Sequence, residues 1–496
     1  MNRGSNRAKG CLPTKPALGG CPVATIVIGI PTDLKFLAEP ISLLLRQLEG
    51  VVAGALGGKA VDYAVVERKV AEATAGVERA AHQAVLQSLD IDRPAVLVAG
   101  KRHVKVGRCS GTYYTMAGQV SVERTLYRES GRREARAVDA VSLRAGVVAD
   151  GWLPQTARAM AHQVQQAPSR EAVASAGQLC RLPYSRCAFE DVAHAVGALL
   201  APVQVDVEAA LIEEYTVPAE ARSVSVSLDR VTVPIEVARP RPPGRPKKRA
   251  AKRPVARVFR QAYCGTVTLH DAAGEALHTL RYGRMPAGGA DKLCEGMAGD
   301  VWALLEQRPE LRVAILCDGA PEMWNLLRAQ IHEGVLGTRV HELLDFWHLL
   351  EKLGAAARVM FGESGAAAVL GRWRLELLNR ASAASAILGE LRASGKEGER
   401  VGESKPVHEA ITYLDHHAER MNYARARRLG LPIGSGNVEA TCKSLFEVRM
   451  KRGSPRWKEP TGEHIVQLRA LALSDRWDRA MDITLAPLRR PVKAAA

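Results

Sequence analysis

The most constraining feature of the sequence is the uninterrupted apolar segment 313–317, which is followed at once by Asp318 and Gly319. A strand with no polar face has to be covered on both sides, so the segment predicts a central strand in a sheet with helices on its faces. An acid at the carboxyl end of such a strand faces the crevice where open α/β sheets bind ligands. The alternative is structural, because Asp-Gly is a common turn and Asp318 would then only cap the helix that begins at Pro321.

The region 223–344 has the predicted order strand, strand, strand, helix, strand, helix, strand. Hairpin-like strands followed by strand–helix alternation favour a mixed sheet with helices packed on it. The expected strands lie near 224–236, 258–269, 276–283, 312–317 and 339–344, and the expected helices near 289–307 and 321–332.

Asp229 lies where the hydrophobic alternation of the first strand changes phase. Apolar residues occupy even positions up to Leu228 and odd positions from Val231 onward. This change predicts a bulge or bend at Asp229 and Arg230, a feature that redirects side chains near active sites. A plain turn between two short strands would explain the same pattern without a bulge.

Glu439 follows the glycine-flanked turn 434–438 and opens a helix that is rich in basic residues. The helix dipole favours a carboxylate in the first turn whatever its role. The cations beyond it favour a second interpretation, a metal-binding carboxylate beside a phosphate-binding surface. These cations are Lys443, Arg449, Lys451, Arg452, Arg456 and Lys458.

The net charge of +16 and the pI near 9.6 favour an anionic partner, nucleic acid first. Ten of these positive charges lie between Arg239 and Arg260 without any acid, which leaves 16 − 10 = +6 for the rest of the chain. The basic segment also holds five prolines, so we expect a loop that neutralises phosphates without reading sequence, or alternatively a solvated linker. The DNA-binding candidates in it are Arg245, Lys247, Lys248, Arg249, Lys252 and Arg253.

Several classes of protein are disfavoured. The nine cysteines form no C-x-x-C pair, and no secretory signal is seen, so we expect a reduced, cytoplasmic and nucleoid-associated protein without structural zinc. No G-x-x-x-x-G-K-[ST] segment predicts an ATP site. The apolar segment 21–30 is too short to span a bilayer, so no membrane role is indicated.

Two short helices in the region 152–200 have helix-turn-helix dimensions. One expected helix covers 169–177, and the second starts near Ser185, which would be its N-cap. The pair either reads DNA or is an ordinary hairpin of helices in a helical domain.

Taken together, Asp229, Asp318 and Glu439 resemble the acidic triad of a DDE transposase with a ribonuclease-H-like core. The segment 430–443, with Arg449-Met-Lys451 and Arg456-Trp457 beyond it, resembles the C-terminal block of bacterial insertion-sequence transposases of the ISKra type. The segments 317–319 and 345–348 also fit that group. Arg230 departs from the glycine that the group commonly has after its first acid, and the segment 239–257 resembles an insertion.

The resemblance implies an α+β multidomain fold in which a helical and hairpin-rich N-terminal DNA-binding region precedes a ribonuclease-H-like mixed α/β core with a helical insertion. The expected units are a loose N-terminus and helical region (1–92), a hairpin-rich module (93–147), a helix-turn-helix-like region and connector (148–222), the first part of the core (223–350), the helical insertion (351–430), the final core helix (431–475) and a tail (476–496).

The chemistry implied by the resemblance is cleavage and transfer of DNA strands with two Mg²⁺ ions, for which Mn²⁺ would substitute. Asp229 would contact both ions, and Asp318 and Glu439 would hold one each. His348 is a possible accessory residue, or is simply packed in its helix. We expect DNA partners, namely element ends and target, and a homodimer or larger assembly on DNA. The alternatives are a non-catalytic, domesticated DNA-binding protein or regulator, and a ribonuclease-H-like nuclease without joining activity.

Overall fold

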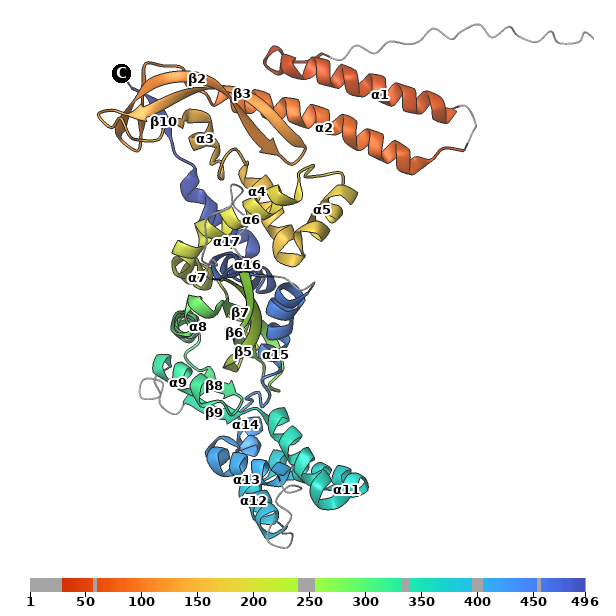
Figure 1. The fold of residues 1–496 in the computed structure, drawn as a ribbon, viewed down its shortest axis with the longest axis vertical. Coiled ribbons are helices and arrows are strands. Elements are labelled where there is room, and N and C mark those ends of the chain that lie inside the picture. The colour runs from red at the N-terminus through yellow and green to blue at the C-terminus, as the bar shows by residue number, and fades with distance from the viewer. Residues whose placement is uncertain are drawn as a thin grey trace, which may run out of the picture.

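The computed structural model describes residues 29–56, 60–239, 255–331, 339–394, 405–452 and 456–495. Within these residues the chain is an α+β protein with two five-stranded sheets. Figure 1 shows an elongated molecule in which one sheet and a pair of long helices lie near one end, and the second sheet lies in the middle. A group of helices that includes α11 to α14 forms the other end.

The central sheet has the strand order β7-β6-β5-β8-β9. Neighbours among β5, β6 and β7 pair antiparallel, whereas β8 pairs parallel with both β5 and β9. This mixed sheet and its strand and helix order were predicted and are confirmed. The strands are β5 (Ser223–Ala238), β6 (Val255–His270), β7 (Ala276–Arg284), β8 (Arg312–Cys317) and β9 (Val340–Leu344).

Helices cover both faces of the central sheet, as the apolar strand β8 requires. The helices α8 (Ala290–Gln307), α9 (Pro321–Gln330) and α11 (Phe346–Asn379) contribute to one hydrophobic core with residues of β5, β7 and β8. On the opposite face, a second core contains the π-helical segment η6 (Cys442–Lys451) and α16 (Glu459–Leu473). In Figure 1, α8 and α15 flank the sheet on opposite sides.

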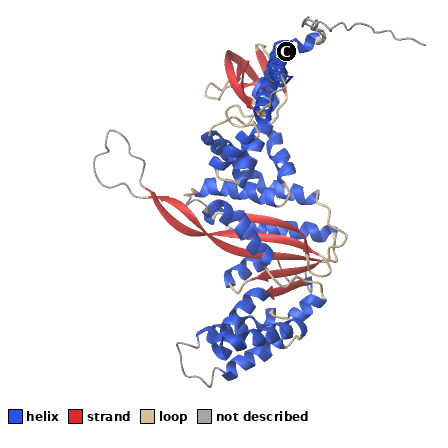
Figure 2. Ribbon diagram, turned by 90° about the vertical axis from the view of Figure 1, so that its right-hand side faces the viewer, coloured by secondary structure: helices blue, strands red, loops and turns tan. Residues whose placement is uncertain are grey.

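The predicted bulge at Asp229 is wrong. The antiparallel register of β5 and β6 is unbroken from Ser223 to Ala238, and Figure 2 shows the two strands as one long twisted ribbon. The change in hydrophobic phase has another cause. The side chains up to Leu228 belong to the core under α8 and α9, whereas those from Val231 belong to the core under η6 and α16. The buried face of the strand therefore changes while its backbone pairing does not.

The N-terminal part begins with a helical hairpin and continues into the second sheet. The turn η1 (Thr32–Leu37) leads into α1 (Ala38–Leu56), which packs on α2 (Tyr63–Ser88). The sheet has the order β10-β1-β2-β3-β4, and its longest strands, β2 and β3, form a hairpin. Its members are β1 (Ala95–Val98), β2 (Lys101–Thr115), β3 (Gly118–Glu129), β4 (Val138–Asp139) and β10 (Val492–Ala494), and the short helix α3 (Ala140–Ala145) follows β4.

A helical layer lies between the two sheets and contains the predicted pair of short helices. It comprises α4 (Pro154–Gln166), α5 (Ser169–Gln178), α6 (Arg186–Leu200), the turn η2 (Ala201–Val203) and α7 (Gln204–Glu213). Ser185 caps α6 as predicted, because its hydroxyl oxygen accepts the backbone N–H of Ala188 at 3.3 Å. Much of α6 is packed against α4 and α16, and its outer side carries the acid Asp191. DNA reading by this pair stays a prediction.

The stretch Arg186–Glu213, which contains α6 and α7, is long and apolar enough to cross a membrane by length and composition alone. In this fold 44% of its most apolar window is buried inside the protein. Its apolar character is therefore accounted for by packing in the helical layer.

The chain between β9 and the C-terminal helices is helical where it is described. After α11 come α12 (Ala383–Ser394), α13 (Lys405–His417), the turn η5 (Ala418–Arg420) and α14 (Tyr423–Arg428). The chain then returns to the central sheet with α15 (Gly436–Thr441). The segment 476–496, expected to be a tail, contains α17 (Trp477–Leu485), the turn η7 (Ala486–Leu488) and the strand β10.

Candidate active site

Three aspartates lie on three neighbouring strands of the central sheet: Asp318 and Asp345 directly follow β8 and β9, whereas Asp229, expected at a strand end, lies inside the longer β5. β5 and β8 run parallel, and extending their register by three residues sets Asp229 opposite Asp318. β8 and β9 also run parallel, and extending their register by one residue sets Asp318 opposite Asp345. Asp318 and Asp345 therefore lie where the parallel strands β8 and β9 end, the place where open α/β sheets bind ligands, and the register sets Asp229 of β5 beside Asp318. The first two were predicted as site residues, whereas Asp345 was noted only within the segment 345–348 that fits the resembling group.

Asp229 is held by its own strand and by a cysteine from the opposite core. One carboxylate oxygen accepts the backbone N–H of Arg230 at 2.6 Å, and the other accepts the thiol of Cys442 at 3.5 Å. Cys264 lies directly opposite Asp229 on β6. Contact with Cys264, burial and the charge of Asp229 all raise the pKa of the Cys442 thiol far above its usual range. The thiol is therefore protonated at neutral pH and donates a hydrogen bond to the carboxylate.

Arg230, which stands where the resembling group commonly has glycine, is held by an acid on α9. Its guanidinium donates to Glu322 at 2.6 Å, and the hydroxyl of Tyr263 donates to the other oxygen of the same carboxylate at 2.9 Å. Glu322 lies in the first turn of α9, where the helix dipole favours a negative charge. The positive charge next to Asp229 is thus matched by a carboxylate outside the predicted triad.

Asp318 ends β8 in a tight turn that leads into α9. Its carboxylate accepts the backbone N–H of Ala320 at 2.9 Å, and its backbone carbonyl accepts the indole N–H of Trp324 at 2.8 Å. A Cβ on Gly319 would lie 2.5 Å from the ring of Tyr413, so glycine is required for α13 to approach this turn. The structural alternative for Asp318 is therefore realised in part: the side chain stabilises the turn before α9 but does not cap the helix itself.

Asp345 connects the strand ends to the turn that precedes Glu439. Only 1% of Asp345 is exposed, and its two carboxylate oxygens accept the backbone N–H groups of His348, at 2.6 Å, and of Ser435. The next residue, Phe346, donates its N–H to the carbonyl of Ile433 at 3.0 Å. These bonds fix the start of α11 against the loop that leads into α15.

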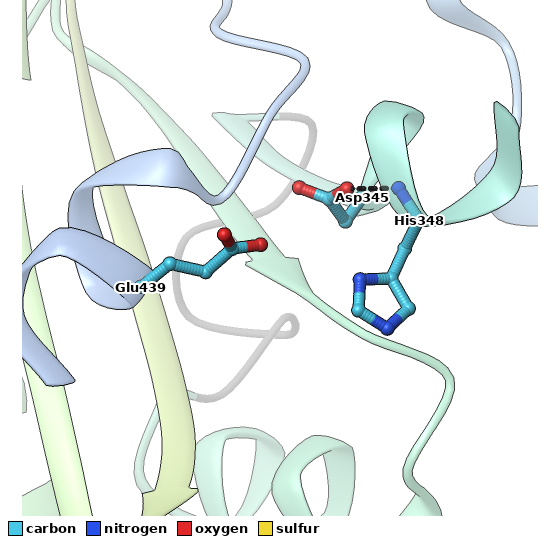
Figure 3. Close-up of side chains that lie close together, drawn as sticks. All are labelled: Asp345, His348 and Glu439. Carbon is cyan, nitrogen blue, oxygen red and sulfur yellow. Dashed lines mark hydrogen bonds between the residues drawn. The ribbon is translucent and has the colours of Figure 1, made fainter. Parts of the chain in front are cut away.

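A compact group of potential metal ligands is formed by Asp345, His348 and Glu439. One potential ligand atom from each of them lies within 4.8 Å of the others, and Figure 3 shows Glu439 reaching from α15 toward the two residues at the start of α11. Two carboxylates and one imidazole suit a divalent ion such as Mn²⁺ or Zn²⁺, whereas Mg²⁺ favours oxygen ligands alone. Each carboxylate oxygen of Asp345 keeps a second lone pair beside its backbone hydrogen bond.

The predicted triad and this compact group share only Glu439. Among the described residues, no group of three ligands at that spacing contains Asp229 or Asp318. Glu439 is nevertheless tied to Asp229, because Cys442 lies one helical turn beyond Glu439 and contacts the Asp229 carboxylate. The placement of Glu439 in the first turn of a helix was predicted and is confirmed.

Most of the predicted basic residues near Glu439 are exposed, and one is not. Arg449 is only 6% exposed, donates to the carbonyl of Val164 at 2.9 Å and lies 4.8 Å from the centre of the Trp457 ring. Its guanidinium packs α4 against η6 and does not lie on the surface, which corrects its assignment as a DNA-binding residue. The exposed members are Lys443, Lys451, Arg452, Arg456 and Lys458.

Two of these exposed cations have partners, Lys451 with Glu447 at 2.9 Å and Arg452 with Glu171 at 3.0 Å. The six candidates in the proline-rich segment, Arg245, Lys247, Lys248, Arg249, Lys252 and Arg253, lie outside the described residues. The basic set around the acids therefore stays a prediction, with Arg449 removed from it.

Sequence reasoning missed further residues beside the acids. Trp347 is 50% exposed and lines a cavity together with Arg427 of α14, a helix that also carries Arg425 and Arg428. The basic run 425–428 is visible in the sequence, but it falls in a region predicted only as helical. Asp345 could have been found from the sequence, because it directly follows the expected strand 339–344, just as Asp318 directly follows the strand 312–317.

Comparison with known proteins gives little. No family model matches the chain, and no curated protein is similar to it in sequence. Among solved structures, the Drosophila P element transposase strand transfer complex aligns with 67% of this chain and 83% of that chain, at 13% identity and a TM-score of 0.24. A likeness at this level supports no conclusion about fold or activity.

Proposed function

We infer that this protein is a DNA transposase of the DDE type, with a ribonuclease-H-like core similar to that of ISKra insertion sequences. The observation that carries the proposal is the parallel register of β5 and β8, whose extension sets Asp229 opposite Asp318, the residue that follows β8. Glu439 reaches the neighbouring Asp345 from a late helix. The sheet order β7-β6-β5-β8-β9, with three antiparallel strands followed by two parallel ones, supports the same core.

Asp229, Asp318 and Glu439 would hold the divalent metal ions, because carboxylate oxygens are the ligands that such ions prefer. When bound, the ions would activate a water or a DNA 3′-hydroxyl and stabilise the leaving oxygen. Cys442 orients Asp229 through its hydrogen bond, and Asp345 fixes the turn before Glu439. His348 is placed close enough to Glu439 to contribute a fourth ligand or to contact the scissile phosphate.

The DNA would approach over the exposed cations that follow Glu439, namely Lys443, Lys451, Arg452, Arg456 and Lys458. Cations of this kind contact phosphates and position the duplex without reading its bases. Element ends and target are both DNA, and two copies acting together would hold the two ends. Mg²⁺ is the proposed physiological ion and Mn²⁺ the substitute, with His348 favouring Mn²⁺.

The test uses the purified chain, Mg²⁺ or Mn²⁺, and a DNA fragment that carries the regions flanking its own gene. We expect metal-dependent cuts at defined positions and joined products with a second DNA. Asp229→Asn, Asp318→Asn and Glu439→Gln should each lower cleavage by more than about 100-fold, beyond the 10–100-fold cost of changing residues around a metal site. All three should still bind the DNA.

Two outcomes would replace the proposal. Specific DNA binding with no metal-dependent cutting would identify a non-catalytic DNA-binding protein or regulator. Cutting that never yields joined DNA, with all three variants inactive, would identify a ribonuclease-H-like nuclease.

A further inference from the structure

A cavity of about 370 Å³ opens beside the candidate active site. It lies between the turn after β6, the start of α11 and the loop that leads into α15, and its lining includes Trp347, Arg427, Glu275 and Asn437. This volume is at the lower end of the range for ligand clefts, about 300–1,000 Å³. It is too small for a duplex and large enough for one nucleotide unit.

Trp347 is the aromatic wall of this cavity. It stands between Asp345 and His348 in sequence, so its backbone is fixed by the same hydrogen bonds that fix the compact acidic group. Half of the side chain is exposed, whereas its neighbour Phe346 is only 1% exposed. An indole that remains half in water keeps a large apolar surface available for a flat partner.

The surroundings of Trp347 hold the ring in place, with Gly434 against one edge and Arg374 over one face. A Cβ on Gly434 would lie 2.8 Å from the indole Cδ1 and Nε1 atoms, so only glycine permits this close approach. The guanidinium of Arg374 lies 5.4 Å from the centre of the indole ring, within the range of a cation–π contact. The ring is therefore oriented on one edge by the loop and is accompanied by a cation that attracts phosphate.

The polar groups of the cavity suit a nucleobase joined to a phosphate. Arg427 supplies a positive charge, and Asn437 and Glu275 supply amide and carboxylate groups that can hydrogen-bond to the edge of a base. His270 also lines the cavity, and burial lowers its pKa to about 4, so its ring is neutral near pH 7. An aromatic face with cations beside it is the arrangement that single-stranded nucleic acid uses for stacking.

We propose that this cavity binds one unstacked nucleobase of a DNA strand, stacked on Trp347, next to the acids. The proposal rests on the proposed function for the identity of the strand, which would be the one that passes the scissile phosphate. A base held outside the helix would fix the position of the strand end and keep the duplex open at the cut.

The test measures binding without catalysis. A fluorescent single strand of about twelve thymidines and an abasic strand of the same length are titrated with the protein in EDTA, and fluorescence anisotropy gives both dissociation constants. The two strands carry the same phosphates, so the ratio of the constants reports base contacts alone. The ratio is the dissociation constant of the abasic strand divided by that of the thymidine strand. We expect it to fall about tenfold from its wild-type value in Trp347→Ala and to be largely kept in Trp347→Phe.

Tyr63→Ala is the matched control, because Tyr63 is a 69% exposed aromatic residue on α2. An unchanged ratio in Trp347→Ala, or an equal fall in Tyr63→Ala, would overturn the proposal. Circular dichroism checks folding, and if Trp347→Ala is unfolded, Trp347→Leu takes its place, because leucine fills the space without offering a ring.

The proposal and the proposed function fail separately. Glu439→Gln should keep the wild-type ratio, since the measurement needs no metal. If the ratio depends on Trp347 but the protein never cuts DNA, the base site is supported and the proposed transposase activity is rejected. Metal-dependent cutting together with a ratio that is unchanged in Trp347→Ala would support the transposase and reject the base site.

Discussion

At the scale of single residues, Asp229 depends on a neighbour that no sequence pattern indicated. The strand position of Asp229 follows from the alternation of β5, but its partner Cys442 lies more than 200 residues away on η6. A lone cysteine in a helix looks like a core residue, and only the packing of η6 on β5 brings its thiol to the carboxylate. Sequence reasoning could therefore place Asp229 on its strand, but could not identify the side chain that orients its carboxylate.

We predict that Cys442→Ala lowers metal-dependent cleavage by about tenfold, the lower end of the cost of losing a partner of a metal ligand. The side chain would lose its hydrogen bond to Asp229, and the carboxylate would be free to rotate. Steady-state cleavage rates at saturating metal measure the effect.

Cys294→Ala is the control for that prediction. Cys294 is a buried thiol on α8, 1% exposed, so its replacement leaves a hole of similar size. Equal losses of activity in the two variants would show that Cys442 matters for packing and not for orienting Asp229.

At the scale of elements, periodicity predicted more than turns did. The apolar run of β8 and the order of strands and helices expected over 223–344 predicted the central sheet, because burial on both faces has a direct signature in the sequence. The same logic misread β5, where the buried face changes at Asp229 without a bulge. The pairing of β10 with β1 was also missed, since a three-residue strand carries no periodic signal.

The first turn of α9 carries Glu322, which pairs with Arg230 beside Asp229, so the variant Glu322→Gln tests the role of this pair. Without the carboxylate, the guanidinium of Arg230 would lose its partner and compete with metal ions for the acids. We expect the metal concentration for half-maximal cleavage to rise by about fivefold, as for an interaction of about 1 kcal/mol.

The double variant Glu322→Gln with Arg230→Gln should return that metal concentration to near the wild-type value. If the double variant stays impaired, Glu322 acts on the site by some route other than Arg230.

Helix packing around the sheet depends on a buried ion pair between α8 and the residue before α17. Asp300 and Arg476 are 2.9 Å apart, and both are nearly fully buried. The hydroxyl of Tyr282 also donates to Asp300. We predict that Asp300→Ala lowers the free energy of unfolding by about 3–5 kcal/mol, because it leaves the Arg476 charge buried without its partner.

Urea unfolding of the two proteins gives this difference. Glu214→Ala is the control, because Glu214 forms an exposed pair with Arg479 of the same helix α17. It should leave the free energy of unfolding nearly unchanged. Similar losses of unfolding free energy in the two variants would show that the buried pair contributes no more to stability than the exposed pair.

At the scale of the whole molecule, the acids lie at the middle of an elongated chain. The central sheet that carries Asp229 and Asp318 is flanked by the N-terminal helical layer on one side and by α11 to α14 on the other (Figure 1). Glu439 returns to this sheet only after the long helical excursion from α11 to α14. Segments separated by more than 200 residues therefore have to meet before any shared metal site exists.

The most direct test of that meeting is to map the bound metal on the whole chain. Fe²⁺ would replace Mg²⁺, and with ascorbate and peroxide it would generate radicals that cut the polypeptide beside the ion. The account predicts breaks near Asp229, Asp318 and Glu439 together, all suppressed by excess Mg²⁺ and by Glu439→Gln. Breaks confined to the region of Asp345, His348 and Glu439, with none near Asp229 or Asp318, would contradict a shared site for the triad.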